Sequence, residues 1–304
     1  MSSQGQISMN RAHGIDISSW ETFYRPVDNP PRPVDFAIQR TSYGLIEDSQ
    51  FRSMQPGIMQ APVKGAYHYP SSAIPWKAQA DFHIDLLGGK YDFFAWDPEK
   101  GYNGNTTAFI DGICPSIEYI AKTTKLPGLF YTNPDMWGTW FKPIQNDIIY
   151  LLSRTDINIK LWVAHYWWIP NPDAQPNYWK VAGAANMPQD WLMWQYDCNG
   201  QGGKGKQYGV GSAGLDLSVF NGNADALHKW LGNAQIPPQT GTTPGSTAYR
   251  VIYARINVRA LPDGNSKWVR YAVLNERLQV VSISNGWAQL VDNTYVYAAY
   301  IQKV

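Results

Sequence analysis

The sequence has only two cysteines, Cys114 and Cys198, so it offers neither a disulfide framework nor a cysteine cluster of the kind that binds zinc. We expect these two cysteines to remain unpaired. No apolar run approaches the length needed to span a membrane, and the polar stretch Met1–Asn10 lacks the apolar segment of a secretory signal. The formal net charge is only +1 at pH 7, and the main part of the chain has no basic patch for a nucleic acid.

Motifs for cofactors and metals are also missing. The sequence contains no glycine-rich phosphate loop, no metal-binding spacing and no nucleophilic serine or cysteine arrangement. We therefore expect no cofactor and no metal. Aromatic residues, in contrast, are abundant, with 14 Trp, 19 Tyr and 10 Phe. Aromatic rings stack on the apolar faces of sugar rings, although ordinary core packing uses the same residues.

Two acidic residues follow an apolar run in the segment from Phe94 to Glu99. Side chains alternate between the two faces of a strand, so Asp97 and Glu99 would point the same way, with Cα atoms about 6.5–7 Å apart. A pair of carboxyl groups on one face is what cleavage of a glycosidic bond requires. Pro98 stiffens the backbone between the two acids. For this segment alone, a surface turn with two solvated acids is the alternative interpretation.

Short apolar runs recur along the first part of the chain and predict about eight strands, the number that a closed barrel needs. The runs are Gly14–Ser18, Phe36–Arg40, Val63–Tyr69, Asp92–Trp96, Gly128–Thr132, Leu161–His165, Trp191–Tyr196 and Leu215–Val219. Helical patterns fit between the early runs, best over Thr106–Thr124 despite Pro115, and again over Pro143–Arg154. The last three runs leave little room for helices, so we expect adjacent antiparallel strands there. The predicted fold is α/β, an irregular TIM-like β/α barrel that is regular in its first half, with catalytic residues at the C-terminal ends of strands.

A stretch rich in proline, glycine and threonine divides the chain. We expect a flexible N-terminus over residues 1–10, a barrel domain over 11–233, a linker over 234–248 and a small all-β domain over 249–304. The last of these has about seven Lys and Arg residues against about three acids, a net charge of roughly +4. A basic module favours an anionic surface, although a solvated face without a partner is equally compatible with this charge.

The predicted strands resemble those of glycoside hydrolase family 25, the lysozymes of the Chalaropsis type. The matching segments occur in the family's order between Arg11 and Gly232. They are His13–Trp20, Phe36–Gly44, Gly65–Tyr69, Trp96–Glu99, Phe130–Thr132, Leu161–Tyr166, Trp194–Tyr196 and Gly214–Phe220. The sequence departs from the family at Pro98, in the middle of an Asp-x-Glu motif whose central residue is usually apolar, and at Ser218, where the family often has Asn.

The resemblance implies hydrolysis of the β-1,4 bond between N-acetylmuramic acid and N-acetylglucosamine in peptidoglycan, with Glu99 as the general acid. Neighbouring aromatic residues such as Trp96 and Tyr131, together with a nearby carboxylate, would raise the pKa of Glu99 toward the working pH. Three roles stay open for Asp97: a base for water, a nucleophile, or an acceptor for the acetamido N–H of the substrate while the acetamido oxygen attacks the anomeric carbon. We favour the third role, with retention of configuration.

Asp16 and Asp216 resemble the two other acids of the family's site. They are expected on the first and last strands, which are neighbours in a closed barrel, where they would hold the sugar or the developing charge. For both, a polar residue satisfied inside the barrel mouth is the alternative. The candidates for sugar contacts are Tyr67, Tyr131, His165, Tyr166, Trp194 and Gln195. For each candidate, packing in the core is the alternative to a sugar contact.

The C-terminal part resembles a bacterial SH3 domain, on the Asn257-Val258-Arg259 opening followed by Pro262 and on the later run from Gly286 to Leu290. Alternating apolar residues and turns rich in Gly, Asn and Asp independently predict a small β-barrel. The resemblance implies a module that holds cell-wall peptide and so raises the effective concentration of the enzyme at the wall. A spacer without affinity of its own is the alternative.

The resulting prediction is a monomeric muramidase, secreted or phage-encoded, that acts on the bacterial wall after lysis or after export by a route not visible in this chain. Its partner is peptidoglycan, with the glycan strand in the barrel and wall peptide on the C-terminal domain; no nucleic acid and no membrane is expected to bind. A non-catalytic peptidoglycan-binding protein on the same barrel is the main alternative, and a hydrolase of chitin-like polymers is another. The presence of all four acids argues against a non-catalytic binding protein. The C-terminal part, which resembles a cell-wall-binding domain, argues against a hydrolase of chitin-like polymers.

Overall fold

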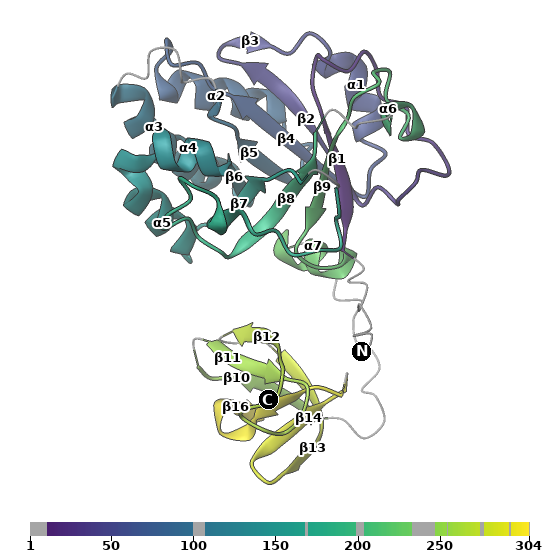
Figure 1. Cartoon of the computed structure of the whole chain (residues 1–304), viewed down its shortest axis with the longest axis vertical. Helices are drawn as coiled ribbons and strands as arrows, with labels where there is room; N and C mark the ends of the chain where they lie inside the picture. The colour runs from purple at the N-terminus through teal and green to yellow at the C-terminus, as the bar shows by residue number, and fades with distance from the viewer. Residues whose placement is uncertain are drawn as a thin grey trace. The chain divides into compact units, whose positions relative to one another are not determined.

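The computed structural model describes residues 11–99, 107–167, 170–198, 204–232, 247–253, 255–273, 277–291 and 293–303. The chain divides into two compact units, Met1–Ala234 and Gln235–Val304 (Figure 1). The predicted flexible N-terminus, most of the predicted linker and Thr106, the first residue of a predicted helix, lie outside the described residues. None of the helices in the described ranges combines the length and the apolar character that a membrane crossing requires.

A sheet of nine strands forms the centre of the first unit, and eight of them close into a barrel (Figure 1). The barrel strands are β1 (His13–Ile17), β2 (Phe36–Tyr43), β4 (Val63–Tyr69), β5 (Phe93–Trp96), β6 (Gly128–Thr132), β7 (Ile159–Ala164), β8 (Trp191–Asp197) and β9 (Asp216–Phe220). The short strand β3 (Ile46–Glu47) pairs only with β2. Because β1 pairs with both β2 and β9, the sheet closes on itself. Each predicted apolar run forms one of the barrel strands, so the predicted barrel is confirmed.

The strand directions explain why the barrel is irregular. Strands β1, β2 and β4 to β8 are parallel to one another, whereas β9 is antiparallel to both β8 and β1. The predicted antiparallel arrangement is therefore right for β9 but wrong for the pair β7 and β8. Residues 165–190 join these two strands through the short helix η3 (Tyr178–Lys180), and a connection of that length can return to the starting end of the barrel without a long helix.

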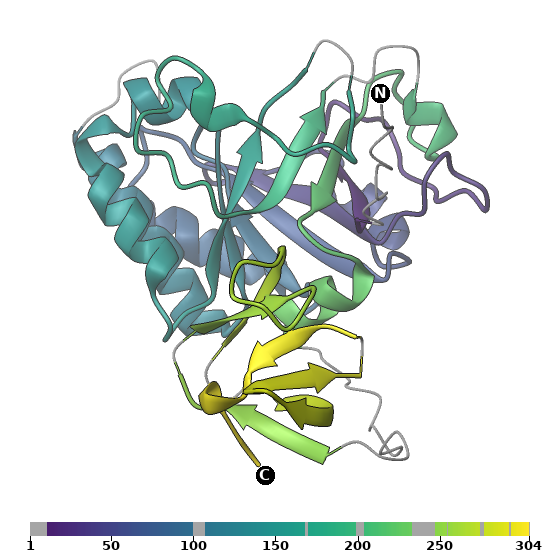
Figure 2. The same cartoon turned by 60° about the horizontal axis from the view of Figure 1, so that its bottom comes forward.

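The helices cluster in the first half of the barrel, as predicted. They are α1 (Phe51–Ile58), α2 (Trp76–Leu87), α3 (Thr107–Thr124), α4 (Pro134–Thr139), η2 (Lys142–Ile144), α5 (Gln145–Ser153), α6 (Lys204–Gln207) and α7 (Ala224–Trp230). Helix α3 continues through Pro115, and α5 with η2 covers the second predicted helical segment. Helix α3 packs against α2 and α5 along one side of the barrel (Figure 1, Figure 2).

Alternation along the strands divides the core into two layers. On β5, Phe93 and Ala95 belong to the cluster that fills the barrel, whereas Phe94 and Trp96 belong to the cluster between the barrel and the helices. Trp230 of α7 packs against Phe93 with ring centroids 5.5 Å apart, so α7 covers the end of the barrel where the parallel strands begin. The opposite end, where these strands finish, is left for the site. Because Phe93 and Ala95 face the interior of the barrel, the next residue of this alternating set, Asp97, is expected to face the interior as well.

The second unit is an all-β domain with its own core. Its elements are β10 (Thr247–Val251), β11 (Arg255–Arg259), β12 (Trp268–Val273), β13 (Arg277–Ser284), β14 (Trp287–Leu290), β15 (Tyr295–Tyr297), η4 (Ala298–Tyr300) and β16 (Ile301–Lys303), in the sheet order β12-β11-β15-β14-β13-β10-β16. Asn285 and Gly286 join β13 to β14 with φ values of 50° and 79°. Positive φ at both positions is typical of a tight hairpin turn, which is why the sequence has Asn-Gly there.

Candidate active site

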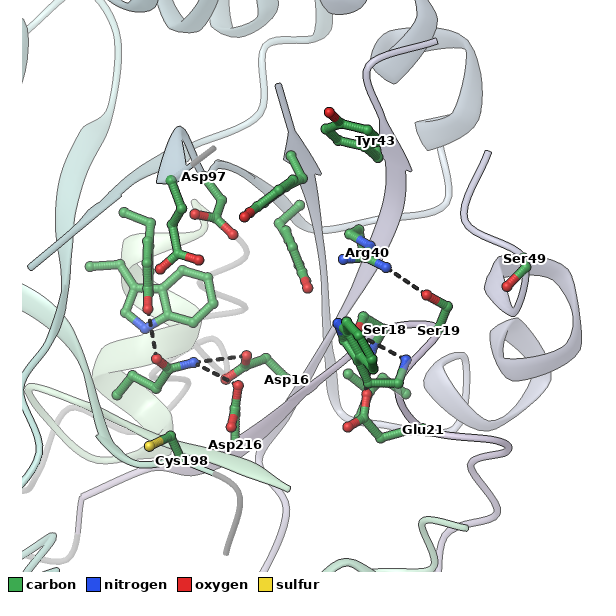
Figure 3. Close-up of a pocket in the computed structure, with 18 residues that line it drawn as sticks. Asp16, Ser18, Ser19, Glu21, Arg40, Tyr43, Ser49, Asp97, Cys198 and Asp216 are labelled. Atoms are coloured by element: carbon green, nitrogen blue, oxygen red, sulfur yellow. Dashed lines mark hydrogen bonds between the residues drawn. The ribbon is translucent and has the colours of Figure 1, made fainter. Parts of the chain in front are cut away.

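A cavity of about 760 Å³ opens at the end of the barrel where the parallel strands finish (Figure 3). Its walls come from β1, β2 and β4 to β8, mostly from their C-terminal ends, and from the start of the antiparallel strand β9. The cavity is lined by seven of the ten predicted site residues: Asp16, Tyr67, Asp97, Glu99, Tyr131, Gln195 and Asp216. The structure therefore brings together all four of the acids that were singled out from the sequence.

Asp97 and Glu99 reach the cavity because β5 ends just before them. The backbone N–H of Asp97 donates to the carbonyl oxygen of His68 at 2.9 Å, which continues the pairing of β5 with β4 by one residue. Asp97 is buried, and its Oδ1 atom has no hydrogen-bond partner among the described residues.

Burial is the main reason why both acids resist ionisation. It raises the pKa of Asp97, and the negative charges of Glu99 and Asp16 raise it further, against a smaller opposite effect of Arg40. Burial also raises the pKa of Glu99, the Tyr131 hydroxyl offsets part of this increase, and the charge of Asp216 adds to it. Closely placed carboxyl groups titrate as a set, so the cavity retains at least one proton at a pH where isolated carboxyl groups would all be ionised.

Asp16 and Asp216 face each other across the β1–β9 pair, where they are register partners. Figure 3 shows the two side chains next to each other, with dashed lines joining them to one amide group. This amide belongs to Gln195, whose Nε2 lies 2.9 Å from Asp16 Oδ1 and 3.5 Å from Asp216 Oδ2. Burial raises the pKa of Asp16 well above its usual value, the charge of Asp216 raises it further, and the hydrogen bond from Gln195 offsets part of the increase.

Gln195 also connects this acid pair to the opposite wall of the cavity. Its Oε1 accepts a hydrogen bond from the Tyr131 hydroxyl at 2.8 Å and another from the Tyr166 hydroxyl. A chain of hydrogen bonds therefore runs from Asp16, through the Gln195 amide, to the Tyr131 hydroxyl.

The sequence comparison that decides the family is the match to the group described as Glycosyl hydrolases family 25, over residues 15–203. The match covers more than half of the chain and includes Asp16, Asp97, Glu99 and Gln195. The chain belongs to glycosyl hydrolase family 25. It is therefore a glycoside hydrolase. The cavity of this family 25 hydrolase is lined by five acids, the four predicted ones and Glu21.

Solved structures share the fold of this family 25 hydrolase. The bacterial lysozyme from Streptomyces coelicolor is similar with a TM-score of 0.55 and 22% identity, covering 73% of this chain and 98% of that chain. The muramidase from Trichobolus zukalii gives a TM-score of 0.53 and 18% identity, covering 73% of this chain and 100% of that chain. Comparison with curated protein sequences gave no match. At these identities the structural similarity shows the fold of the barrel.

Three of the predicted sugar contacts do not line the cavity. Trp194 has 0% of its surface exposed and donates from Nε1 to the carbonyl oxygen of His165 at 2.7 Å, so the prediction of a sugar contact is wrong for this residue. The reason is alternation along β8: since Gln195 faces the cavity, Trp194 faces the outer layer. The His165 side chain instead contacts Asn177, with Nε2 3.0 Å from Oδ1. Tyr166 reaches only the edge of the site, through its hydroxyl bond to Gln195.

Other cavity residues were missed by the sequence analysis. Arg40 lies in the cavity wall on β2, where its Nε donates to Asp48 at 2.7 Å and its Nη2 donates to the Ser19 hydroxyl at 2.6 Å. The sequence did contain one indication that Arg40 belongs to the site, because Arg40 is a charged residue inside an otherwise buried strand. Trp20 lines the rim with 81% of its surface exposed, and Trp162 lies deeper in the cavity on β7. Nothing in the local sequence distinguishes an exposed Trp20 from a core tryptophan.

No group of three or more His, Cys, Asp or Glu side chains in the described part of the chain is arranged to hold a metal ion. Both cysteines are free thiols, and Cys198 lines the cavity while Cys114 lies on α3. Burial raises the pKa of Cys198, which keeps the thiol protonated and unreactive. The polar groups that line the cavity are carboxyl groups, phenols, serine hydroxyls, the Gln195 amide, the Cys198 thiol and the Arg40 guanidinium.

Proposed function

We propose that the chain is a lysozyme that hydrolyses the β-1,4 bond between N-acetylmuramic acid and N-acetylglucosamine in bacterial peptidoglycan. The observation that carries the proposal is the position of Asp97 and Glu99, two carboxyl groups with raised pKa at the end of β5, opposite the Asp16–Asp216 pair in one cavity. The cavity is built by a single chain, so a monomer is sufficient. Substrate would be met at the bacterial wall, after lysis or export.

Glu99 acts as the general acid in this proposal. As the glycosidic bond breaks, the Glu99 proton moves to the leaving oxygen, which becomes a hydroxyl group. The raised pKa of Glu99 supports this role because the acid must still hold its proton at the working pH. In the second half of the reaction the Glu99 carboxylate takes a proton from the attacking water, which returns it to its starting state.

Asp97 assists the acetamido group of the substrate. Its buried Oδ1 has no partner among the described residues and can accept the acetamido N–H. The acetamido oxygen then bonds to the anomeric carbon as the bond to the leaving oxygen breaks, and water later displaces it with net retention. Asp16 and Asp216, held by Gln195, direct carboxyl oxygens toward the positive character that develops at the anomeric carbon.

The test is release of muropeptides from purified peptidoglycan by the wild type and by Glu99→Gln, with Glu118→Gln on α3 as the matched control. We expect new N-acetylmuramic acid reducing ends from the wild type and from the control, and a loss of about 100-fold or more for Glu99→Gln. Proton NMR of the first product should show the retained anomer. If the wild type sediments with the wall and releases nothing, the non-catalytic binding protein is the correct reading.

We also propose that the C-terminal unit holds wall peptide. A cavity of about 360 Å³ in this unit is lined by Asn257, Arg259, Gly264, Trp287, Tyr297 and Tyr300. The rings of Trp287 and Tyr297 lie 5.6 Å apart at 74°, and those of Tyr297 and Tyr300 lie 5.4 Å apart at 62°. Aromatic faces beside one guanidinium suit the methyl groups and carboxylates of a short peptide. This arrangement supports the binding module implied by the sequence resemblance.

A further inference from the structure

Arg40 is the one cationic side chain among the described residues that line the cavity of the barrel. Five acids line the same cavity, so an anion that enters it is repelled by every acid that is ionised. Of these lining residues, Arg40 alone offers such an anion an opposite charge. The proposed reaction uses the acids and the Gln195 amide, and it leaves Arg40 without a role.

A β-bulge in β2 turns Arg40 toward the cavity. The register between β2 and β4 shifts between Arg40 and Ser42, so Thr41 is the extra residue of the bulge. The hydroxyl groups of Thr41 and Ser42 both lie 2.8 Å from histidine rings that pack beside Trp96 in the outer layer. Arg40 and Tyr43 therefore both line the cavity, although strict alternation over three positions would turn one of them outward.

The guanidinium of Arg40 is held in place and still has donors to spare. Its Nε donates to Asp48 Oδ2 at 2.7 Å, and its Nη2 donates to the Ser19 hydroxyl at 2.6 Å (Figure 3). The same Asp48 oxygen accepts the backbone N–H of Ser19 at 3.0 Å, which anchors the ion pair. A guanidinium has five N–H groups, and the hydrogen bonds among the described residues use only those on Nε and Nη2. The Nη1 group is left to donate to an acceptor in the cavity.

The surroundings of the guanidinium are largely enclosed. Arg40 Cζ lies 5.9 Å from the centroid of the Tyr69 ring, and the Tyr43 ring lies 5.8 Å from that of Tyr69. Only 15% of the Arg40 side chain is exposed. Attraction between opposite charges is stronger in such surroundings than in open water. A carboxylate that reaches this wall of the cavity therefore gains more than it would at an exposed arginine.

We propose that Arg40 binds a carboxylate of the muramic acid substituent and so makes the enzyme favour muramic acid at the sugar whose bond is cleaved. The inference rests on the proposed function, which supplies a substrate with such a group. A guanidinium with a fixed orientation and free N–H groups is well suited to a carboxylate. Arg40 is thereby a residue that determines specificity.

The chemistry of the sugar agrees with the positions of Arg40 and Asp97. In muramic acid the lactyl ether is attached to the ring carbon next to the carbon that carries the acetamido group. Arg40 is in register with Tyr67, which is in register with Ala95, so two strand spacings of about 4.8 Å separate Arg40 from β5. A sugar held at Asp97 by its acetamido group can therefore direct the neighbouring lactyl group to the wall that carries Arg40.

A structural role for Arg40 would end at its bonds to Asp48 and Ser19. Arg52 provides an example of such a role, since its Nε and Nη2 donate to Glu47 at 2.9 and 2.8 Å. The Arg52 side chain is 62% exposed and is not among the described groups that line the cavity. Removal of this second ion pair is therefore a matched control for removal of the first.

The experiment compares kcat/KM of the full-length enzyme for two forms of one soluble tetrasaccharide of alternating N-acetylglucosamine and N-acetylmuramic acid. In one form the lactyl carboxylates are free, and in the other they are converted to uncharged methylamides. We expect the wild type to favour the carboxylate form by roughly 10-fold or more, the size of one charge-assisted hydrogen bond. Equal kcat/KM values for the two forms in the wild type would overturn the inference.

The decisive variant is Arg40→Met combined with Asp48→Asn. Arg40→Met alone would leave Asp48, with 1% of its side chain exposed, as a buried charge without its cation. The ratio of kcat/KM for the two forms is taken within each variant, so a loss of folded protein cancels. We expect this ratio to fall to about one in the double variant and to keep its wild-type value in Arg52→Met combined with Glu47→Gln. An unchanged ratio in the Arg40 and Asp48 variant would overturn the inference.

A third form of the tetrasaccharide identifies the source of the carboxylate. Here an alanyl-glutamate dipeptide is joined to each lactyl group, so the carboxylates belong to the peptide. A preference for this form over the methylamide that also depends on Arg40 would assign the peptide carboxylate to the site; without it, the lactyl carboxylate is the ligand. A wild type that cleaves none of the three forms would refute the proposed function and the inference with it. Equal cleavage of all three would leave the lysozyme proposal standing and remove only the inference.

Discussion

Trp20 is the most exposed of the large apolar residues in the described part of the chain, and it lines the rim of the cavity with 81% of its surface free. An indole that contributes little to the core can offer its face to a sugar ring. We expect Trp20→Ala to raise KM for soluble glycan about 3- to 10-fold with little change in kcat, because stacking of this kind acts equally on the ground state and the transition state. Steady-state kinetics on a defined oligosaccharide measures both constants.

The control for this substitution is Tyr150→Ala. Tyr150 lies on α5 with 67% of its surface exposed, and it is not among the residues that line the cavity. The control should leave KM and kcat unchanged. A drop in kcat at constant KM for Trp20→Ala would mean that the indole acts on the transition state rather than on binding.

At the residue scale, sequence alone located the acids but not their surroundings. Asp97 and Glu99 could be placed because alternation and the strand end fix their direction. Alternation along β8 also shows why Trp194 and Gln195 cannot both face the cavity. The sequence of this strand has no feature that indicates which of the two does. Arg40 was missed because a cation among buried neighbours reaches the cavity through pairing with Asp48 and Ser19, which are distant in sequence.

At the element scale, close packing of β5 against its neighbours fixes the direction in which Asp97 and Glu99, the proposed catalytic acids, point. Gly128 at the start of β6 lies directly against Phe94, and an added Cβ would come within 2.4 Å of Phe94 Cζ and 2.8 Å of Ile159 Cδ1. We expect Gly128→Ala to lower the free energy of unfolding by about 1–3 kcal/mol, the usual cost of overpacking. In calorimetry this corresponds to a Tm lower by a few degrees for a unit of this size.

A glycine with open space around it provides the control for this prediction. An added Cβ at Gly264 meets no heavy atom within 4 Å, so Gly264→Ala should change the Tm of the protein by less than about 1 °C. An unchanged Tm for Gly128→Ala would show that Phe94 can move aside without cost. In that case the packing around β5 would not be what holds Asp97 and Glu99 in place.

The positions of the strands and helices were easier to predict from the sequence than the directions in which neighbouring strands run. Each barrel strand coincides with an apolar run because a strand buried on both faces is apolar throughout. The predicted direction of β8 was wrong. The sequence between β7 and β8 leaves little room for a helix, and this favoured antiparallel pairing of the two strands. A connection with only η3 in its described part still returns the chain to the same end of the barrel.

At the scale of the whole molecule, the buried acids of the site lower the free energy of unfolding by an amount that depends on pH. The folded-state pKa of Asp16 is raised by burial above its unfolded value of about 3.9. Below that pH the carboxyl is protonated in both states and has no effect. As the pH rises, the unfolded chain ionises freely while the folded site resists, so the cost grows until the folded-state pKa is passed. Asp16→Asn should therefore raise the Tm at pH 7.5 more than at pH 4.

Thermal unfolding at the two pH values measures this difference. Asp85→Asn, an exposed position on α2, serves as the control and should change the Tm little at either pH. An equal increase in Tm at both pH values for Asp16→Asn would mean that removal of the charge is not the cause. A decrease at pH 7.5 would mean that the hydrogen bond from Gln195 more than compensates for the burial of Asp16.

The two units together predict a difference between soluble and insoluble substrates. A module that holds the wall raises the local concentration of the barrel near its substrate, but it adds nothing when the glycan is small and free. We expect Trp287→Ala to weaken sedimentation with purified walls on the order of tenfold, since it removes an aromatic anchor of the C-terminal cavity. Wall clearing should slow, hydrolysis of soluble oligosaccharide should stay constant, and Ile283→Ala, on the same unit but outside that cavity, should change neither. If Trp287→Ala slows both substrates equally, the C-terminal unit supports the folded barrel instead of bringing it to the wall.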